Sequence, residues 1–136
     1  MLKEVGWPAV LGTESLAHLA EAIDEIDFAS MHGLAICGTG SIFCAGADLE
    51  RMVGASTLEE PGFVARQGFD TVNSLRDLPV PVFAFINGTA WGAGLELALR
   101  ADSLTAAEGA AMIGLPWVSL GLILGWGWSP LSGRTR

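Results

Sequence analysis

Residues 81–102 read PVFAFINGTAWGAGLELALRAD, and this stretch decides the fold class. It opens with a short apolar run that ends in an Asn-Gly turn, which predicts a buried strand over residues 81–88. From Gly92 the segment GAGLELALRAD predicts a helix that begins with glycines. A strand, a glycine loop and a helix in this order are typical of an α/β layer fold.

A second junction of the same kind precedes this stretch. Residues 33–38, GLAICG, form another apolar run between glycines, which predicts a second buried strand. The polar loop TGSIFCAGAD follows at once, and Asp48 is placed to cap a short helix over LERM. The start of this loop, GTGSIF, has Phe43 where a dinucleotide-binding fingerprint needs its third glycine, so a nucleotide site is not indicated.

Two further helices are predicted from helical periodicity. Thr13–Ile26 carries apolar residues at helical spacing with acidic residues between them, as in an amphipathic helix. Pro61 opens a second segment, which Pro79 ends. Its shared face comprises Val64, Gly68, Val72 and Leu75. Residues 103–115 are expected to add short strands, and the alternating order implies right-handed crossovers in one α/β unit.

Composition narrows the class of partner. The 136 residues suit one domain, and 51% hydrophobic content is enough to bury a core. The net charge of -8 and scattered basic residues argue against nucleic acid. Cys37 and Cys44 lack a paired spacing, so we expect reduced cysteines in a cytoplasmic protein. His18 and His32 have no ligand partner at metal-binding spacing, so no metal is expected.

The region 109–133 contains no charged residue and is long enough to be a transmembrane candidate. Its glycines and prolines favour strands, turns and short helices instead. No secretory leader pattern opens the chain. We therefore expect no membrane partner, with a membrane-anchored protein as the remaining alternative.

Both strand-loop-helix junctions place backbone N–H groups without helical acceptors near the end of a buried strand, where they can bind an anion or oxyanion. The simpler alternative for either loop is an ordinary tight turn. Glu96 lies three residues beyond Ala93, on roughly the same helix face, so its carboxylate can serve as a general acid/base beside that amide. A solvent-facing helix glutamate is the alternative, although the neighbouring residues are apolar.

The two junctions together resemble the enoyl-CoA hydratase/isomerase (crotonase) superfamily. The matching segments are FCAGADLERM, residues 43–52, and INGTAWGAGLELAL, residues 86–99. The chain is most similar to the hydratase region of bacterial multifunctional fatty-acid oxidation proteins, from about residue 11 to residue 127, with an atypical tail at 129–136. The resemblance implies a crotonase-like (ClpP/crotonase) ββα-spiral core in one partial domain, residues 1–136, incomplete at both ends.

The resemblance also implies an acyl-CoA thioester as substrate, with coenzyme A as part of the substrate and no separate cofactor. Its carbonyl oxygen would accept hydrogen bonds from the amides of Ala47 and Ala93, and preformed donors of this kind stabilise developing negative charge. Glu96 matches the first of two catalytic glutamates. The implied substrate-binding residues are Ala45, Gly46, Ala47, Asp48, Leu49, Gly92 and Ala93. Intact members form homotrimers, hexamers or multifunctional β-oxidation complexes.

Several positions depart from the family pattern. Trp117 stands where the second glutamate is expected, and an indole cannot exchange protons as a base or acid. Ala93 replaces a more usual glycine, which is tolerable if its φ stays negative. Leu124 and Trp128 replace a usual proline and glycine, which suggests the hypothesis of a shifted reading frame. Without the opening β-hairpin and C-terminal helices of the family, an exposed apolar core and poor solubility are expected.

The leading function is therefore hydration of 2-enoyl-CoA in fatty-acid β-oxidation. One alternative is Δ3-Δ2-enoyl-CoA isomerisation, which this family can perform with a single carboxylate. The other is a catalytically impaired fragment that binds CoA thioesters, an alternative that Trp117 favours.

Overall fold

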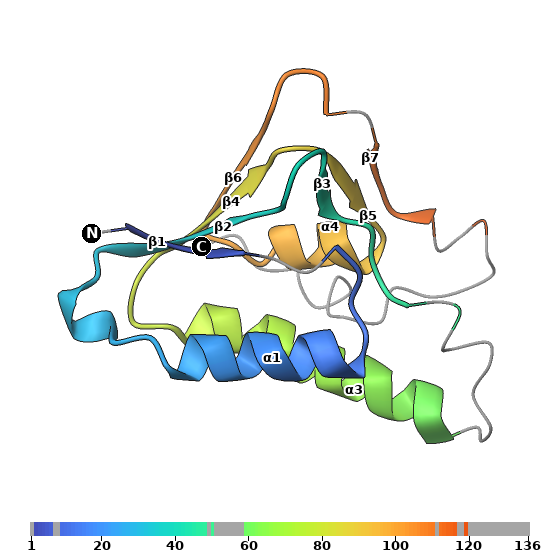
Figure 1. Ribbon diagram of the computed structural model, residues 1–136, viewed down its shortest axis with the longest axis horizontal. Helices are drawn as coiled ribbons and strands as arrows, with labels where there is room; N and C mark the ends of the chain where they lie inside the picture. Colours follow the sequence, from blue (N-terminus) through green and yellow to red (C-terminus); the bar gives the residue numbers. More distant parts are fainter. Residues whose placement is uncertain are drawn as a thin grey trace, which may run out of the picture.

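The computed structural model describes residues 2–6, 9–48, 50, 59–110, 112–116 and 119. After the first strand, the strands along these residues follow one another in pairs that α-helices separate (Figure 1). In chain order the elements are β1 (Leu2–Gly6), α1 (Thr13–Asp24), η1 (Phe28–Ser30), β2 (Gly33–Cys37), β3 (Ile42–Cys44), α3 (Glu59–Ser74), η2 (Leu75–Asp77), β4 (Val82–Ile86), β5 (Thr89–Trp91), α4 (Ala93–Ala98), β6 (Ser103–Ala106) and β7 (Ile113–Gly114). The predicted α/β class is confirmed.

The strands form two sheets, and neighbouring strands within each sheet run parallel to each other. The four-stranded sheet has the order β1-β2-β4-β6, and the three-stranded sheet has the order β3-β5-β7. In the larger sheet Leu34 pairs with Val82 and Ile36 with Ala84, and all four side chains are buried. Side chains paired in register point to the same face of a sheet. The apolar core therefore packs against this face of the larger sheet.

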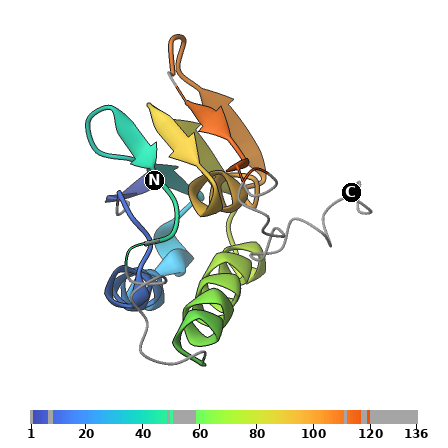
Figure 2. The same ribbon diagram turned by 90° about the vertical axis from the view of Figure 1, so that its right-hand side faces the viewer.

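Helices α1 and α3 lie side by side against one face of the larger sheet (Figure 1 and Figure 2). Helix α1 buries Leu16, Leu19 and Ile23, which recur at the predicted helical spacing. Helix α3 adds Val72, and Leu75 follows in η2. Helix α4 packs against β3, β4 and β5, so it joins the two sheets.

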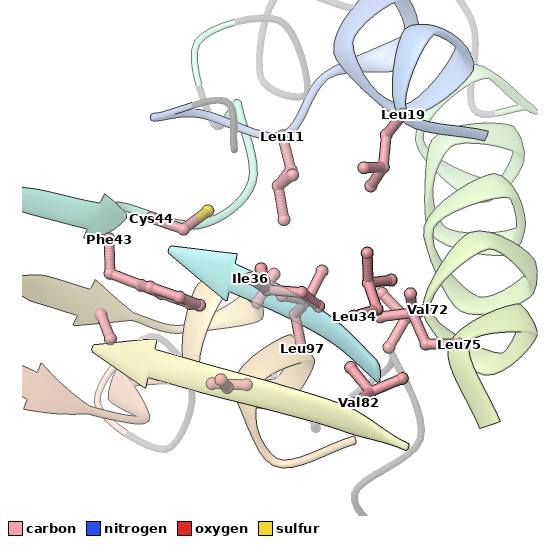
Figure 3. Close-up of a cluster of buried hydrophobic side chains, with 14 of the residues drawn as sticks. Leu11, Leu19, Leu34, Ile36, Phe43, Cys44, Val72, Leu75, Val82 and Leu97 are labelled. Carbon is pink, nitrogen blue, oxygen red and sulfur yellow. The ribbon is translucent and has the colours of Figure 1, made fainter. Parts of the chain in front are cut away.

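One apolar cluster fills the space between the larger sheet and the helices (Figure 3). Leu97 of α4 and Phe43 of β3 have no exposed surface. Burying a side chain of this size stabilises the fold by about 1.5–3 kcal/mol. The short helix α4 is therefore anchored to the core, although six residues alone would be too few for a stable helix.

The helix boundaries differ from prediction by a few residues. Helix α1 ends at Asp24, with Glu25 as its C-cap, and not at Ile26. Helix α3 begins at Glu59, so Pro61 is its third residue. Proline is accepted there because the first four N–H groups of a helix have no intrahelical acceptor.

Strand β1 was not predicted. Its five residues include Lys3 and Glu4, so the segment lacks the apolar run that marked β2 and β4. Parallel pairing with β2, across the intervening α1, defines β1 as a strand. The expected strands in 103–115 are present as β6 and β7, but they belong to different sheets. The predicted LERM helix lies outside the described residues except for Glu50.

Candidate active site

The two predicted junctions lie against each other in the structure. Strands β3 and β5 are parallel neighbours, with Cys44 paired to Ala90, so the chain leaves both strands at the same edge. Gly46 has a φ of 99°, and a Cβ on this residue would lie 2.6 Å from the Trp91 carbonyl oxygen and 3.4 Å from the Ala93 nitrogen. Glycine at position 46 therefore permits the two backbones to touch.

The Ala47 amide is oriented by a parallel bridge to Leu11. The Leu11 N–H donates to the Gly46 carbonyl at 2.8 Å, and the Asp48 N–H donates to the Leu11 carbonyl at 3.0 Å. Since the carbonyl and N–H of one trans peptide point in opposite directions, the Ala47 N–H is directed away from Leu11. Within the described residues, it donates no hydrogen bond.

The Ala93 amide belongs to the first residue of α4. Gly92, its N-cap, has a φ of 56° and a ψ of -123°, a conformation essentially restricted to glycine. The Gly92 carbonyl accepts the N–H groups of Leu95 and Glu96, each at 3.0 Å. Among the parts of the chain that the structure describes, the Ala93 N–H has no acceptor either. No described non-glycine residue has a positive φ, so the condition for alanine at position 93 is met.

Close packing holds the first turn of α4 against β3. A Cβ on Gly94 would overlap the Cys44 carbonyl oxygen and lie 2.7 Å from the Cys44 Cβ. Such an approach is feasible only without a side chain. Gly94 therefore sets the distance between α4 and the 45–48 segment.

Glu96 is buried in this packing, with an exposed fraction of 2%. This excludes the solvent-facing alternative that the sequence left open. The strands that contact α4, namely β3, β4 and β5, contain no charged residue. A carboxylate enclosed by apolar elements is costly unless other charges or hydrogen bonds compensate it, and such groups occur preferentially at functional sites.

Arg100 is a second buried charge, 6% exposed and four residues beyond Glu96. Burial lowers the pKa of Arg100 below its usual value, and repulsion from Arg76 lowers it further, while attraction to Glu96 opposes both effects. Sequence reasoning missed Arg100. Its signal was the spacing of four residues from Glu96, which on a continuous helix would place the two side chains on one face, although α4 ends at Ala98.

Asn87 has a structural role that sequence reasoning also missed. Its Oδ1 accepts the Gly38 N–H at 2.8 Å, and its Nδ2 donates to the Gly40 carbonyl at 2.7 Å. The Thr89 N–H donates to the Ser41 carbonyl at 3.0 Å. The Asn-Gly turn therefore holds the loop before β3 and, through it, the start of the 45–48 segment.

The remaining predicted site residues differ in their exposure to solvent. Ala45 is exposed, and Asp48 is half-buried with its side chain close to Gly12. Leu49 and Trp117 lie outside the described residues. The structure thus brings Gly46, Ala47, Gly92 and Ala93 together at one edge, and Glu96 lies one turn further along α4.

The described residues contain neither a metal-binding cluster nor a membrane-spanning helix. No group of three His, Cys, Asp or Glu side chains there could hold a metal ion. No helix of the described residues has the length and apolar character needed to cross a bilayer. Most of the uncharged region 109–133 lies outside the described residues.

Comparisons with known proteins agree with this architecture. The enoyl-CoA hydratase of Bacillus anthracis matches with a TM-score of 0.84 at 31% identity, over 93% of this chain and 51% of that one. An enoyl-CoA hydratase from Polaromonas sp. JS666 gives 0.86 at 28% identity, over 99% of this chain and 56% of the other. The crotonase-like fold predicted from the two junctions is confirmed.

Sequence relatives cover different shares of this chain. Bacillus subtilis YngF is 43% identical over 122 residues, which is 86% of this chain and 45% of the relative. The fatty acid oxidation complex subunit alpha of Vibrio vulnificus is 44% identical over 86 residues, 62% of this chain and 12% of the relative. The chain thus spans under half of each. The family model described as enoyl-CoA hydratase/isomerase matches residues 10–135. The chain therefore belongs to this family.

Proposed function

We propose that this chain carries the thioester-activating part of an enoyl-CoA hydratase, which adds water to a 2-enoyl-CoA to give a 3-hydroxyacyl-CoA. One observation carries the proposal: two loops in backbone contact present the amides of Ala47 and Ala93, with the buried carboxylate of Glu96 one turn away. The carbonyl oxygen of the thioester would accept both N–H groups.

The two amides would act on the charge that develops during addition. As water oxygen bonds to the β-carbon, the electrons of the double bond shift through the α-carbon to the thioester oxygen. Preformed donors stabilise that oxygen because they need not reorganise as charge develops, and removing one such donor commonly costs about 3–4 kcal/mol. Gly46 and Gly92 support this role by allowing the close approach and the sharp turn that position the amides.

Glu96 would supply the proton transfers. Its carboxylate would accept a proton from the attacking water, and the resulting acid would donate a proton to the α-carbon, so atoms and charge balance in one turnover. Because Trp117 stands at the position of the second family glutamate, a single carboxylate would perform both steps. Residues 45–49 would line the path of the pantetheine and adenine groups.

Proton transfer by one carboxylate also supports a second candidate, Δ3-Δ2-enoyl-CoA isomerisation. Here Glu96 would remove a proton from the α-carbon of a 3-enoyl-CoA and return it to the γ-carbon, while the same amides hold the intermediate enolate.

The test compares crotonyl-CoA with a 3-enoyl-CoA as substrates, using the complete chain and butyryl-CoA as a non-reactive binding probe. Hydration of crotonyl-CoA supports the leading proposal, and turnover of the 3-enoyl-CoA alone supports the isomerase. Binding of butyryl-CoA without turnover of either substrate would identify a silent thioester binder. In that case Trp117→Glu restoring hydration would show that only the second carboxylate was missing. Absence of binding would overturn the proposed function.

A further inference from the structure

Glu96 of α4 and Arg100, two residues beyond the end of that helix, form a cluster of two buried charged residues four positions apart. Glu96 and Arg100 have exposed fractions of 2% and 6%. Burial lowers the pKa of Arg100, the charge of Arg76 in η2 lowers it further, and the charge of Glu96 raises it. The strands against which α4 packs contain no charged residue, and the nearby Asp102 carboxylate accepts the Val82 N–H at 2.9 Å.

Helix geometry gives the cluster a direction. Side chains of a helix lean toward its N-terminus, over the preceding turn. Leu99 retains helical backbone angles as the C-cap, and the Arg100 N–H donates to the Leu97 carbonyl at 2.9 Å. The Arg100 side chain is therefore expected to lie over the turn that carries Glu96, and Glu96 over the turn that carries Ala93.

The charge balance within the cluster favours an ionised glutamate. A guanidinium does not lose its proton in proteins, so the two arginines stay positive. An adjacent positive charge stabilises a carboxylate relative to its acid form, whereas burial does the opposite. The attraction between Glu96 and Arg100 therefore opposes the effect of burial on Glu96.

We propose that Arg100 is a positioning residue, which keeps the Glu96 carboxylate ionised and oriented toward the Ala93 amide. This inference rests on the proposed function for its catalytic consequence, since an ionised Glu96 is ready to accept the first proton. The charge effect itself can be measured without turnover.

The test is a carboxyl-carbon NMR titration of Glu96 in the complete chain, with the signal assigned by its loss in Glu96→Gln. Arg100→Met removes the charge and is expected to raise the pKa of Glu96 by about 1–3 pH units. Arg66→Met, which removes an exposed arginine of α3, is the matched control and is expected to leave that pKa unchanged. Equal pKa values in Arg100→Met and the unmodified chain would overturn the proposal.

A kinetic comparison separates charge from geometry. Arg100→Lys keeps the positive charge but lacks the planar fork, so the pKa of Glu96 should hold while kcat falls and KM stays constant. Full kcat in Arg100→Lys would contradict a positioning role, and this variant carries the test should Arg100→Met fail to fold. If the unmodified chain binds no butyryl-CoA and turns over no substrate, the proposed function fails, yet the titration still decides the inference.

Discussion

Glu96 departs from the usual exposure of glutamate, whereas Gly46 uses a backbone conformation that glycine adopts freely. Glutamate is among the residue types least often fully buried, and Glu96 is only 2% exposed. Gly46 adopts a φ of 99° at a point where a Cβ would press on the next loop. A buried carboxylate costs stability, and such groups occur preferentially at functional sites. Both lie where the proposed thioester oxygen would bind.

Glu96→Gln keeps the size of the side chain but removes its ability to accept a proton. We expect kcat to fall by about 10²- to 10⁴-fold, the usual contribution of general acid/base catalysis. Binding of butyryl-CoA should persist, as measured by calorimetry. The matched control is Glu21→Gln, at an exposed position of α1, and it should retain full activity. Equal loss in both variants would rule out a specific role for Glu96.

Gly46→Ala tests the contact between the two loops. Alanine at this φ costs about 1–2 kcal/mol for backbone strain, and pressure on the Trp91 carbonyl should add about 1–3 kcal/mol. Gly40→Ala is the control, because Gly40 also has a positive φ but open space around it. Chemical denaturation should show the larger loss of unfolding free energy for Gly46→Ala. This variant should also lose butyryl-CoA binding. Similar losses in both variants would contradict the contact argument.

At the scale of elements, the site depends on pairings between distant segments. Strands β3 and β5 have three residues each, too few to be stable as an isolated pair. Packing of α4 and the Asn87 hydrogen bonds hold them in place. The short elements that carry the amides are therefore stabilised by their neighbours.

Asn87→Ala removes both hydrogen bonds to the loop before β3. We expect a loss of about 1–3 kcal/mol in the free energy of unfolding, because the Gly38 N–H is part-buried and loses its acceptor. Asn73→Ala serves as the control, since Asn73 makes one exposed bond to the Phe69 carbonyl within α3. Its effect should stay within about 0.5 kcal/mol. A comparable loss of unfolding free energy in the two variants would show that the Asn87 hydrogen bonds add no specific stability.

At the scale of the whole molecule, the two faces of the larger sheet are covered unequally. Leu34 and Ile36 face the helices, whereas Cys37 and Phe85 pair in register on the opposite face. Phe85 is 43% exposed there. Exposed apolar surface of this kind favours association, which the net charge of -8 opposes by repulsion. The expected homotrimer, hexamer or larger complex stays a prediction.

Self-association should rise as the pH falls from neutral toward the isoelectric point of 4.5, because the repulsion disappears. Phe85→Glu should reduce this association at about pH 5.5, where the new carboxylate is still ionised. Phe63→Glu adds the same charge at a 62% exposed position on α3 and should have a smaller effect. Light scattering measures both, and equal effects would show that net charge alone controls association.

Elements with a local sequence signal could be predicted without the structure. Helix α1, the buried strands β2 and β4 and the start of α4 follow from periodicity, glycine punctuation and apolar runs. The order of the two glycine junctions was enough to indicate the crotonase-like fold. These features need no distant partner, because side-chain spacing and backbone freedom act within a few residues.

Only the tertiary structure decided which residues meet. The Gly46 contact with Trp91 and Ala93 depends on the parallel pairing of β3 with β5. The hydrogen bond between Asn87 and Gly38 joins residues 49 positions apart. Burial of Glu96 and Arg100 likewise depends on the strands that enclose α4. Local pattern places a carboxylate on a helix face, but its solvent exposure and its charged neighbours are set by elements distant in sequence.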